Sequence, residues 1–87
     1  MINLIDILAA ATSAKDEPKA SKSATAEGFR FWIVYNDKEA QFKATMRFFP
    51  TWRLSRIFNA PSLDGIVSKA EAIIKEELSI FPRGGGY

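Results

Sequence analysis

Residues 29–48 alternate between apolar and polar side chains, which predicts a β-hairpin. The odd-numbered positions of a first strand, 29–35, are all large and apolar: Phe29, Phe31, Ile33 and Tyr35. Its other face carries Arg30, Trp32 and Val34. In a second strand, 42–48, the apolar positions are Phe42, Ala44, Met46 and Phe48, and Lys43 and Arg47 point the opposite way. The polar residues 36–39 between the two strands are typical of a turn.

Residues 51–58 fit two patterns. As a strand they place Trp52, Leu54, Arg56 and Phe58 on one side, and as a helix they gather Leu54, Ile57 and Phe58. We favour a third strand, because Pro50 and Pro61 bracket a segment of strand length.

Residues 62–78 show the spacing of an amphipathic helix. Pro61 precedes Ser62, a candidate N-cap, and Asp64 lies in the first turn, where a negative charge suits the helix dipole. The apolar residues recur every three or four positions: Leu63, Ile66, Val67, Ala70, Ile73, Ile74 and Leu78. We expect this helix to pack across the apolar face of the sheet.

Within the first 27 residues, large apolar side chains occur only in residues 1–8. Residues 1–11 predict a short helix with Asn3 as its cap, with Ile2, Ile5 and Ala9 on one stripe and with Leu4 and Leu8 beside that stripe. Residues 12–27 are rich in Ala, Ser, Thr and Lys and predict a flexible linker, since nothing large is available for burial. The predicted fold is α+β: a three-stranded antiparallel sheet in a 28–82 domain, packed by one C-terminal helix. A short N-terminal helix on a flexible linker precedes it, and a flexible tail, 83–87, follows.

Composition narrows the functional classes. Among its 87 residues the chain has neither Cys nor His, so we expect no disulfide, no catalytic site and no metal or other cofactor. Its adjacent Glu76 and Glu77 diverge on a helix rather than form an acid–base pair. No apolar run is long enough to span a bilayer and residues 1–11 lack a basic start, so a cytoplasmic protein is expected.

Charge and aromatic content are concentrated in the middle of the chain. Residues 29–58 hold nine of the eleven aromatic residues, and residues 28–58 hold six cations against two carboxylates, a net charge of +4. A small sheet with one helix leaves one face uncovered, and grouped exposure of large apolar side chains marks interaction sites. We therefore predict a non-enzymatic regulator or inhibitor that binds a cellular protein with an acidic surface, through Trp32, Phe49, Trp52, Arg47 and Arg53.

Two other interpretations remain open. In one, the cations belong to an ordinary solvated sheet face and the aromatic residues are in the core. The N-terminal residues 1–11 would then either fold back on the sheet or dock on a partner. Alternatively the segment binds nucleic acid, with aromatic residues stacking on bases and cations contacting phosphates. The residues for that alternative are Arg30, Lys43, Arg47, Arg53 and Arg56.

Phe31-Trp32 in the first strand and Ser62–Asp64 at the helix start also carry a family resemblance. The order of hairpin, strand and helix resembles small bacteriophage-encoded inhibitors of host machinery, such as the inhibitor of bacterial RNA polymerase made by T7-like phages. In that family a strand containing Phe-Trp leads to a hairpin and then to a helix beginning Thr-Leu-Asp. The resemblance covers about half the chain, which has an extra N-terminal segment and a Gly-rich end. It implies a small non-enzymatic modulator and transfers no contact residue.

Overall fold

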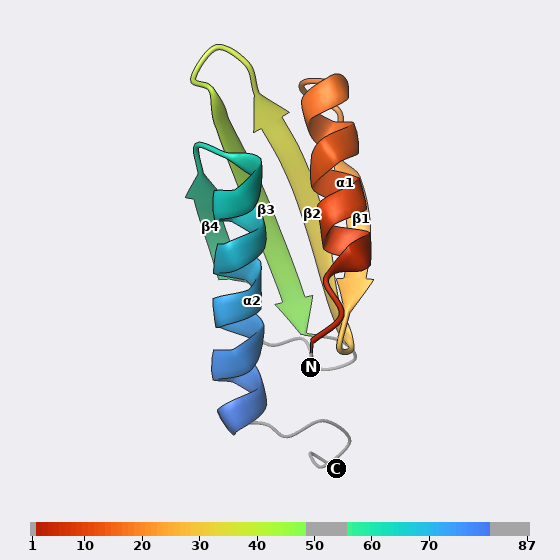
Figure 1. The fold of residues 1–87 in the computed structure, drawn as a ribbon, viewed down its shortest axis with the longest axis vertical. Coiled ribbons are helices and arrows are strands. Elements are labelled where there is room, and N and C mark those ends of the chain that lie inside the picture. Colours follow the sequence, from red (N-terminus) through yellow and green to blue (C-terminus); the bar gives the residue numbers. More distant parts are fainter. Residues whose placement is uncertain (1, 49–55, 81–87) are drawn as a thin grey trace.

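A computed structural model describes residues 2–48 and 56–80 and shows an α+β architecture. The elements follow the order α1 (Ile5–Asp16), β1 (Lys22–Ala26), β2 (Phe29–Asn36), β3 (Gln41–Phe48), β4 (Arg56–Ala60) and α2 (Leu63–Ile80). The four strands form one antiparallel sheet in the order β1-β2-β3-β4. Both helices lie on the same face of the sheet, with α1 over β1 and β2 and α2 over β3 and β4 (Figure 1).

The turns follow from local backbone chemistry. Glu27 and Gly28, the two residues between β1 and β2, have φ angles of 53° and 87°, as a type I′ hairpin turn requires. Between β2 and β3 the side-chain oxygen of Asn36 accepts hydrogen bonds from the backbone N–H groups of Lys38 and Glu39. Ala40 closes this loop with a φ of 52°, a left-handed conformation that costs energy in a residue with a Cβ.

The core lies between the sheet and the two helices. The predicted inward-facing residues of β2 and β3 are confirmed as buried for Phe29, Phe31, Ile33, Phe42, Ala44 and Met46, and Tyr35 is half-buried. Helix α2 buries Ile66, Ala70 and Ile74 against them, and α1 buries Ile7, Ala10, Ala11 and Ala14. Since α1 brings one large side chain and three alanines, it approaches the sheet closely.

The prediction of three strands was wrong, because a fourth strand lies within residues 12–27. In β1 the buried Ala24 and Ala26 alternate with the exposed Ser23 and Thr25, so the period of a strand is present. Its buried positions carry only the methyl groups of alanine. For this reason the spacing of large apolar residues predicted a linker over residues 12–27 instead of a strand. The structure also differs at the N-terminus: the first helix runs to Asp16 and packs in the core instead of ending at residue 11 on a tether.

The predicted cap is present at the start of α2, where the hydroxyl oxygen of Ser62 accepts a hydrogen bond from Gly65 N–H at 3.0 Å. At the start of α1 the N-cap position is Leu4 rather than the predicted Asn3, and the side-chain oxygen of Asn3 accepts a hydrogen bond from Ile5 N–H at 3.0 Å. The apolar stripe of α1 was predicted on the wrong side, since Ile5 is 71% exposed and Ile7 is fully buried. Ile7 and three alanines form the buried side of this helix, and Leu8 is exposed, whereas Leu4, just before the helix, packs against the core.

Candidate docking surface

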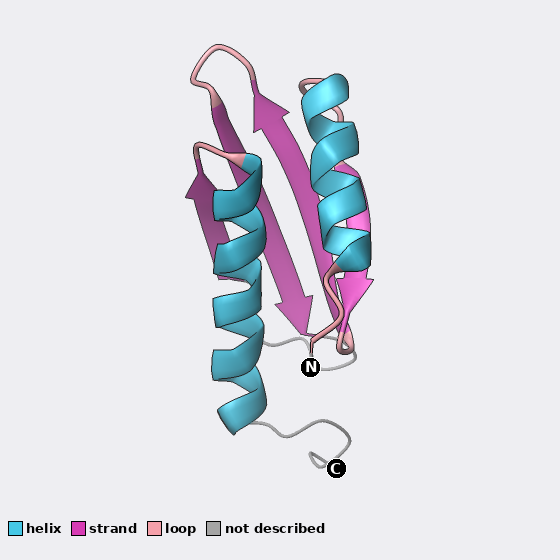
Figure 2. Cartoon of the chain, viewed as in Figure 1, coloured by secondary structure: helices cyan, strands magenta, loops and turns pink. Residues whose placement is uncertain are grey.

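The sheet face opposite the two helices is uncovered by any element of the described chain (Figure 2). We call it the open face. Strand register and alternation assign its residues, row by row across the strands. They are Thr25, Arg30 and Arg47; Ser23, Trp32, Thr45 and Ile57; Val34, Lys43 and Asn59; and Asn36 with Gln41.

Trp32 and two arginines occupy neighbouring rows of the open face. Arg30 on β2 lies directly opposite Arg47 on β3, and both are exposed. Trp32, two residues along β2, is half-buried, and the Arg47 guanidinium carbon lies 6.0 Å from the centre of its ring. That is the outer limit of a cation–π contact, so the arginine partly covers the ring. Trp32 and Arg47, both predicted to contact a partner, therefore lie next to each other on the open face.

Aliphatic groups extend the open face towards β4. Ile57 is 64% exposed and shares a row with Thr45 and Trp32. Val34 is half-buried in the adjacent row. Ile57 was not singled out as a site residue. The alternation of a strand could have identified it, because Ile57 lies between Arg56 and Phe58 and therefore faces the opposite side of the sheet from them.

The charged residues among the described positions of the open face are all cations: Arg30, Lys43 and Arg47. Like charges directly opposite each other on a sheet are destabilising. Within the part of the chain that the structure describes, no carboxylate forms an ion pair with Arg30 or Arg47. The open face is therefore suited to contact with an anionic surface.

Arg56 was predicted to join these cations, and the structure shows that it does not. It lies opposite Met46, on the helix side of β4, where its guanidinium Nη1 is 2.7 Å from Glu76 and 2.8 Å from Glu77 of α2. The hydrogen bond with Glu76 raises the pKa of Arg56, and Glu77 adds to that effect. Arg56 therefore ties β4 to α2. The other predicted contacts, Phe49, Trp52 and Arg53, lie outside the described residues.

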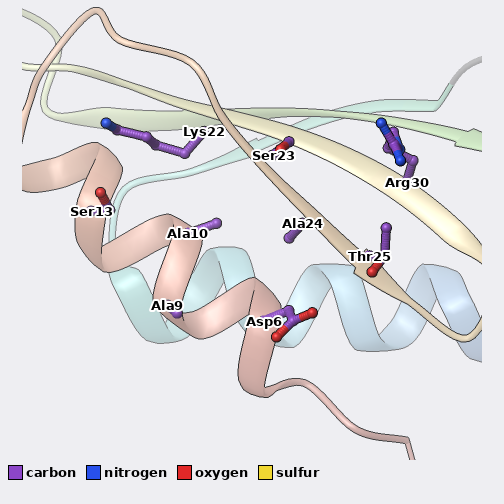
Figure 3. Close-up of a pocket in the computed structure, with 9 residues that line it drawn as sticks. All are labelled: Asp6, Ala9, Ala10, Ser13, Lys22, Ser23, Ala24, Thr25 and Arg30. Atoms are coloured by element: carbon purple, nitrogen blue, oxygen red, sulfur yellow. The ribbon is translucent and has the colours of Figure 1, made fainter.

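A groove of about 470 Å³ runs along the outer edge of β1, between that strand and α1 (Figure 3). Asp6, Ala9, Ala10 and Ser13 line it from α1, Lys22–Thr25 line it from β1, and Arg30 lines it from β2. Lys22 forms an ion pair with Glu17, and its hydrogen bond lowers the pKa of that carboxyl. This groove could not be predicted from the sequence, because the residues of β1 fall in the segment predicted to be a linker.

No three metal-ligating side chains gather within residues 2–48 and 56–80. Over the same ranges, neither helix has the length and apolar character to cross a membrane. No protein-family model, curated protein or solved structure matches this chain.

Proposed function

We propose that this protein is a small non-enzymatic regulator that binds an acidic surface of another protein through its open face. The observation that carries the proposal is the arrangement around Trp32: an aromatic ring beside two opposed arginines, on a sheet face that no described helix covers. Tryptophan and arginine are the residues that most often dominate the energy of protein interfaces.

The partner's chemistry follows from the residues that surround the ring. Ile57 and Val34 would bury aliphatic surface on contact, and Ile57 is 64% exposed without it. Arg30 and Arg47 repel each other until a carboxylate lies between them. A partner surface with an apolar centre and flanking Asp or Glu side chains satisfies both requirements.

Nucleic acid is the weaker candidate on this geometry. A base could stack on Trp32 and phosphates could contact Arg30, Lys43 and Arg47. Because Arg56 lies on the helix side of β4, the described part of the open face has three cations available for phosphates. The exposed aliphatic groups favour a protein surface, since they would add nothing to contact with phosphates.

The proposal is tested by capture of partners from native lysate with the tagged chain, with a nuclease-treated arm. The test variant is Trp32→Ala/Arg47→Glu, and the matched control is Leu8→Ala/Lys38→Glu, which alters one exposed apolar residue and one exposed cation off the open face. We expect one protein to be retained by the wild type and the control, and lost from the test variant.

Two results would contradict this function. Retention that is equal in the test and control variants would show that the open face is not the docking surface. Retention that disappears on nuclease treatment would show that nucleic acid is the partner. Circular dichroism of both variants checks that the fold is unchanged.

A further inference from the structure

The two edge strands of the described sheet, β1 and β4, differ in how they are protected against pairing with a strand of another chain. At the β4 edge, the ammonium group of Lys69 donates a hydrogen bond to the backbone carbonyl of Asn59 at 2.7 Å. A lysine over an edge strand blocks pairing with another chain. The β1 edge has an unbroken register with β2 and contains no proline. Among the described residues, no side chain hydrogen-bonds to the backbone of Lys22–Ala26. The β1 edge is therefore open to another strand.

The groove beside β1 has the space that an added strand needs. Its volume of about 470 Å³ continues into a second hollow of about 340 Å³ that shares Asp6 and Thr25 and reaches Gly28. Together the two hollows follow the whole of β1. An incoming strand would hydrogen-bond to β1 and lie beside α1 without displacing any described element.

Two of the three charged residues that line the groove, Asp6 and Lys22, are complementary to their counterparts in a second copy. The third, Arg30, belongs to β2 and also lies on the open face. Asp6 lies at the end of the groove near Thr25, and Lys22 lies at the opposite end, level with Ser13 (Figure 3). A two-fold axis perpendicular to the sheet would pair β1 with the β1 of a second copy in antiparallel orientation. That rotation brings Asp6 of each copy towards Lys22 of the other. The ammonium group has three donors, so its ion pair with Glu17 leaves capacity for a second carboxylate.

The spacing of the helices also fits two copies. Paired edge strands lie about 4.8 Å apart. Helix α1 packs over both β1 and β2, so it covers the sheet on the inner side of the edge strand (Figure 1). The two α1 helices would then lie side by side on the same face of the joined sheet, where packed helices usually lie about 8–10 Å apart. Small side chains, Ala9, Ala10 and Ser13, face the gap between them.

From the open edge and the complementary charges of Asp6 and Lys22, we propose that this protein forms a symmetric dimer through antiparallel pairing of its β1 edges. The two four-stranded sheets would become one continuous sheet with both open faces on the same side. The two copies of Arg30, one strand in from each edge, would lie about 14 Å apart, or three strand spacings. The dimer would therefore present two cationic surfaces on one side. A partner that carries two acidic sites would bind both of them and would bind the dimer more tightly than a single copy.

Sedimentation of the purified chain, combined with a spin-label distance, tests the dimer without any partner present. The chain has no cysteine, so Thr45→Cys gives a single labelling position on the open face of β3. Pairing at the β1 edge separates the two β3 strands by five strand spacings, about 24 Å, whereas pairing at the β4 edge separates them by three, about 14 Å. We expect a dimer that forms with increasing concentration and gives the longer distance.

Matched charge variants test the proposed contact. Asp6→Lys places the new lysine of each copy next to Lys22 of the other copy. The repulsion should raise the dissociation constant of the dimer by about tenfold or more. Asp64→Lys makes the same charge change in the first turn of α2, away from the groove, and should leave dimerisation unchanged.

Three results would overturn the proposal: a chain that sediments as a monomer at every concentration, a dimer with the shorter label distance, or equal effects of the two charge variants. A monomer would also be the result if the groove binds a strand of a different protein. None of these outcomes bears on whether the open face docks a partner, so the two proposals fail separately.

Discussion

Replacement of Ile7 by alanine tests whether α1 belongs to the folded domain. Ile7 is fully buried, and Ile5, two residues earlier on the same helix, is 71% exposed. The change from Ile to Ala removes three carbon atoms, worth about 2.4 kcal/mol at about 0.8 kcal/mol for each buried methylene. The cavity left behind adds to this loss, so the free energy of unfolding should fall by about 3 kcal/mol, within the usual 2–5 kcal/mol.

Urea denaturation followed by circular dichroism measures this loss. A domain of this size has a free energy of unfolding of roughly 4–13 kcal/mol, at about 0.05–0.15 kcal/mol per residue. A loss of about 3 kcal/mol therefore moves the midpoint well outside experimental error. The control is Ile5→Ala, the same chemical change at the exposed position, which should alter stability by less than about 0.5 kcal/mol.

Equal and small effects of the two substitutions would refute the reasoning. That result would mean that α1 contributes no burial to the fold, as expected for a helix on a flexible tether. A change in the slope of the denaturation curve for Ile7→Ala alone would instead indicate that α1 unfolds separately from the sheet.

Three further predictions concern single features of the fold and of the open face. Ala40→Gly should raise the free energy of unfolding by up to about 1 kcal/mol, because the left-handed φ of 52° no longer strains a Cβ, and thermal denaturation measures the gain; a loss of stability would contradict it. Arg56→Ala should lower stability by about 1 kcal/mol or less, because its partly exposed ion pairs with α2 are lost, and should leave partner capture unchanged; lost capture in a folded variant would restore Arg56 to the docking surface. Oligonucleotide titration should show at most weak binding, and three phosphate contacts would give a log–log salt slope of about −2 for single strands; tight binding with a steeper slope would favour the nucleic-acid alternative.

Large side chains made the hairpin and α2 predictable. Phe31, Phe42 and Ile74 recur at the periods of a strand and of a helix, and the buried residues follow those periods. The same alternation predicted that Trp32 and Arg47 point away from the core, onto the face that the structure leaves open. Local pattern was sufficient for these elements because each has an unambiguous apolar side.

Elements whose buried side consists of alanine could not be predicted in this way. In α1 and β1, Ala14 and Ala24 are buried because the helix and the sheet approach closely, which is a property of the assembled fold. Hydrophobicity alone pointed to Ile5 and Leu8, which the structure leaves exposed. Arg56 shows a similar limit, since only the position of α2 reveals that Glu76 and Glu77 neutralise it.

Site-specific photo-crosslinking in native lysate tests the central claim most directly. A benzophenone amino acid at Ile57 or Val34 would report contacts of the open face, and one at Ala72, exposed on α2, would report contacts of the opposite side of the domain. The proposed function predicts a discrete, nuclease-resistant protein adduct from positions 57 and 34 and none from position 72. Adducts from position 72 alone, or nuclease-sensitive adducts from the open face, would contradict it.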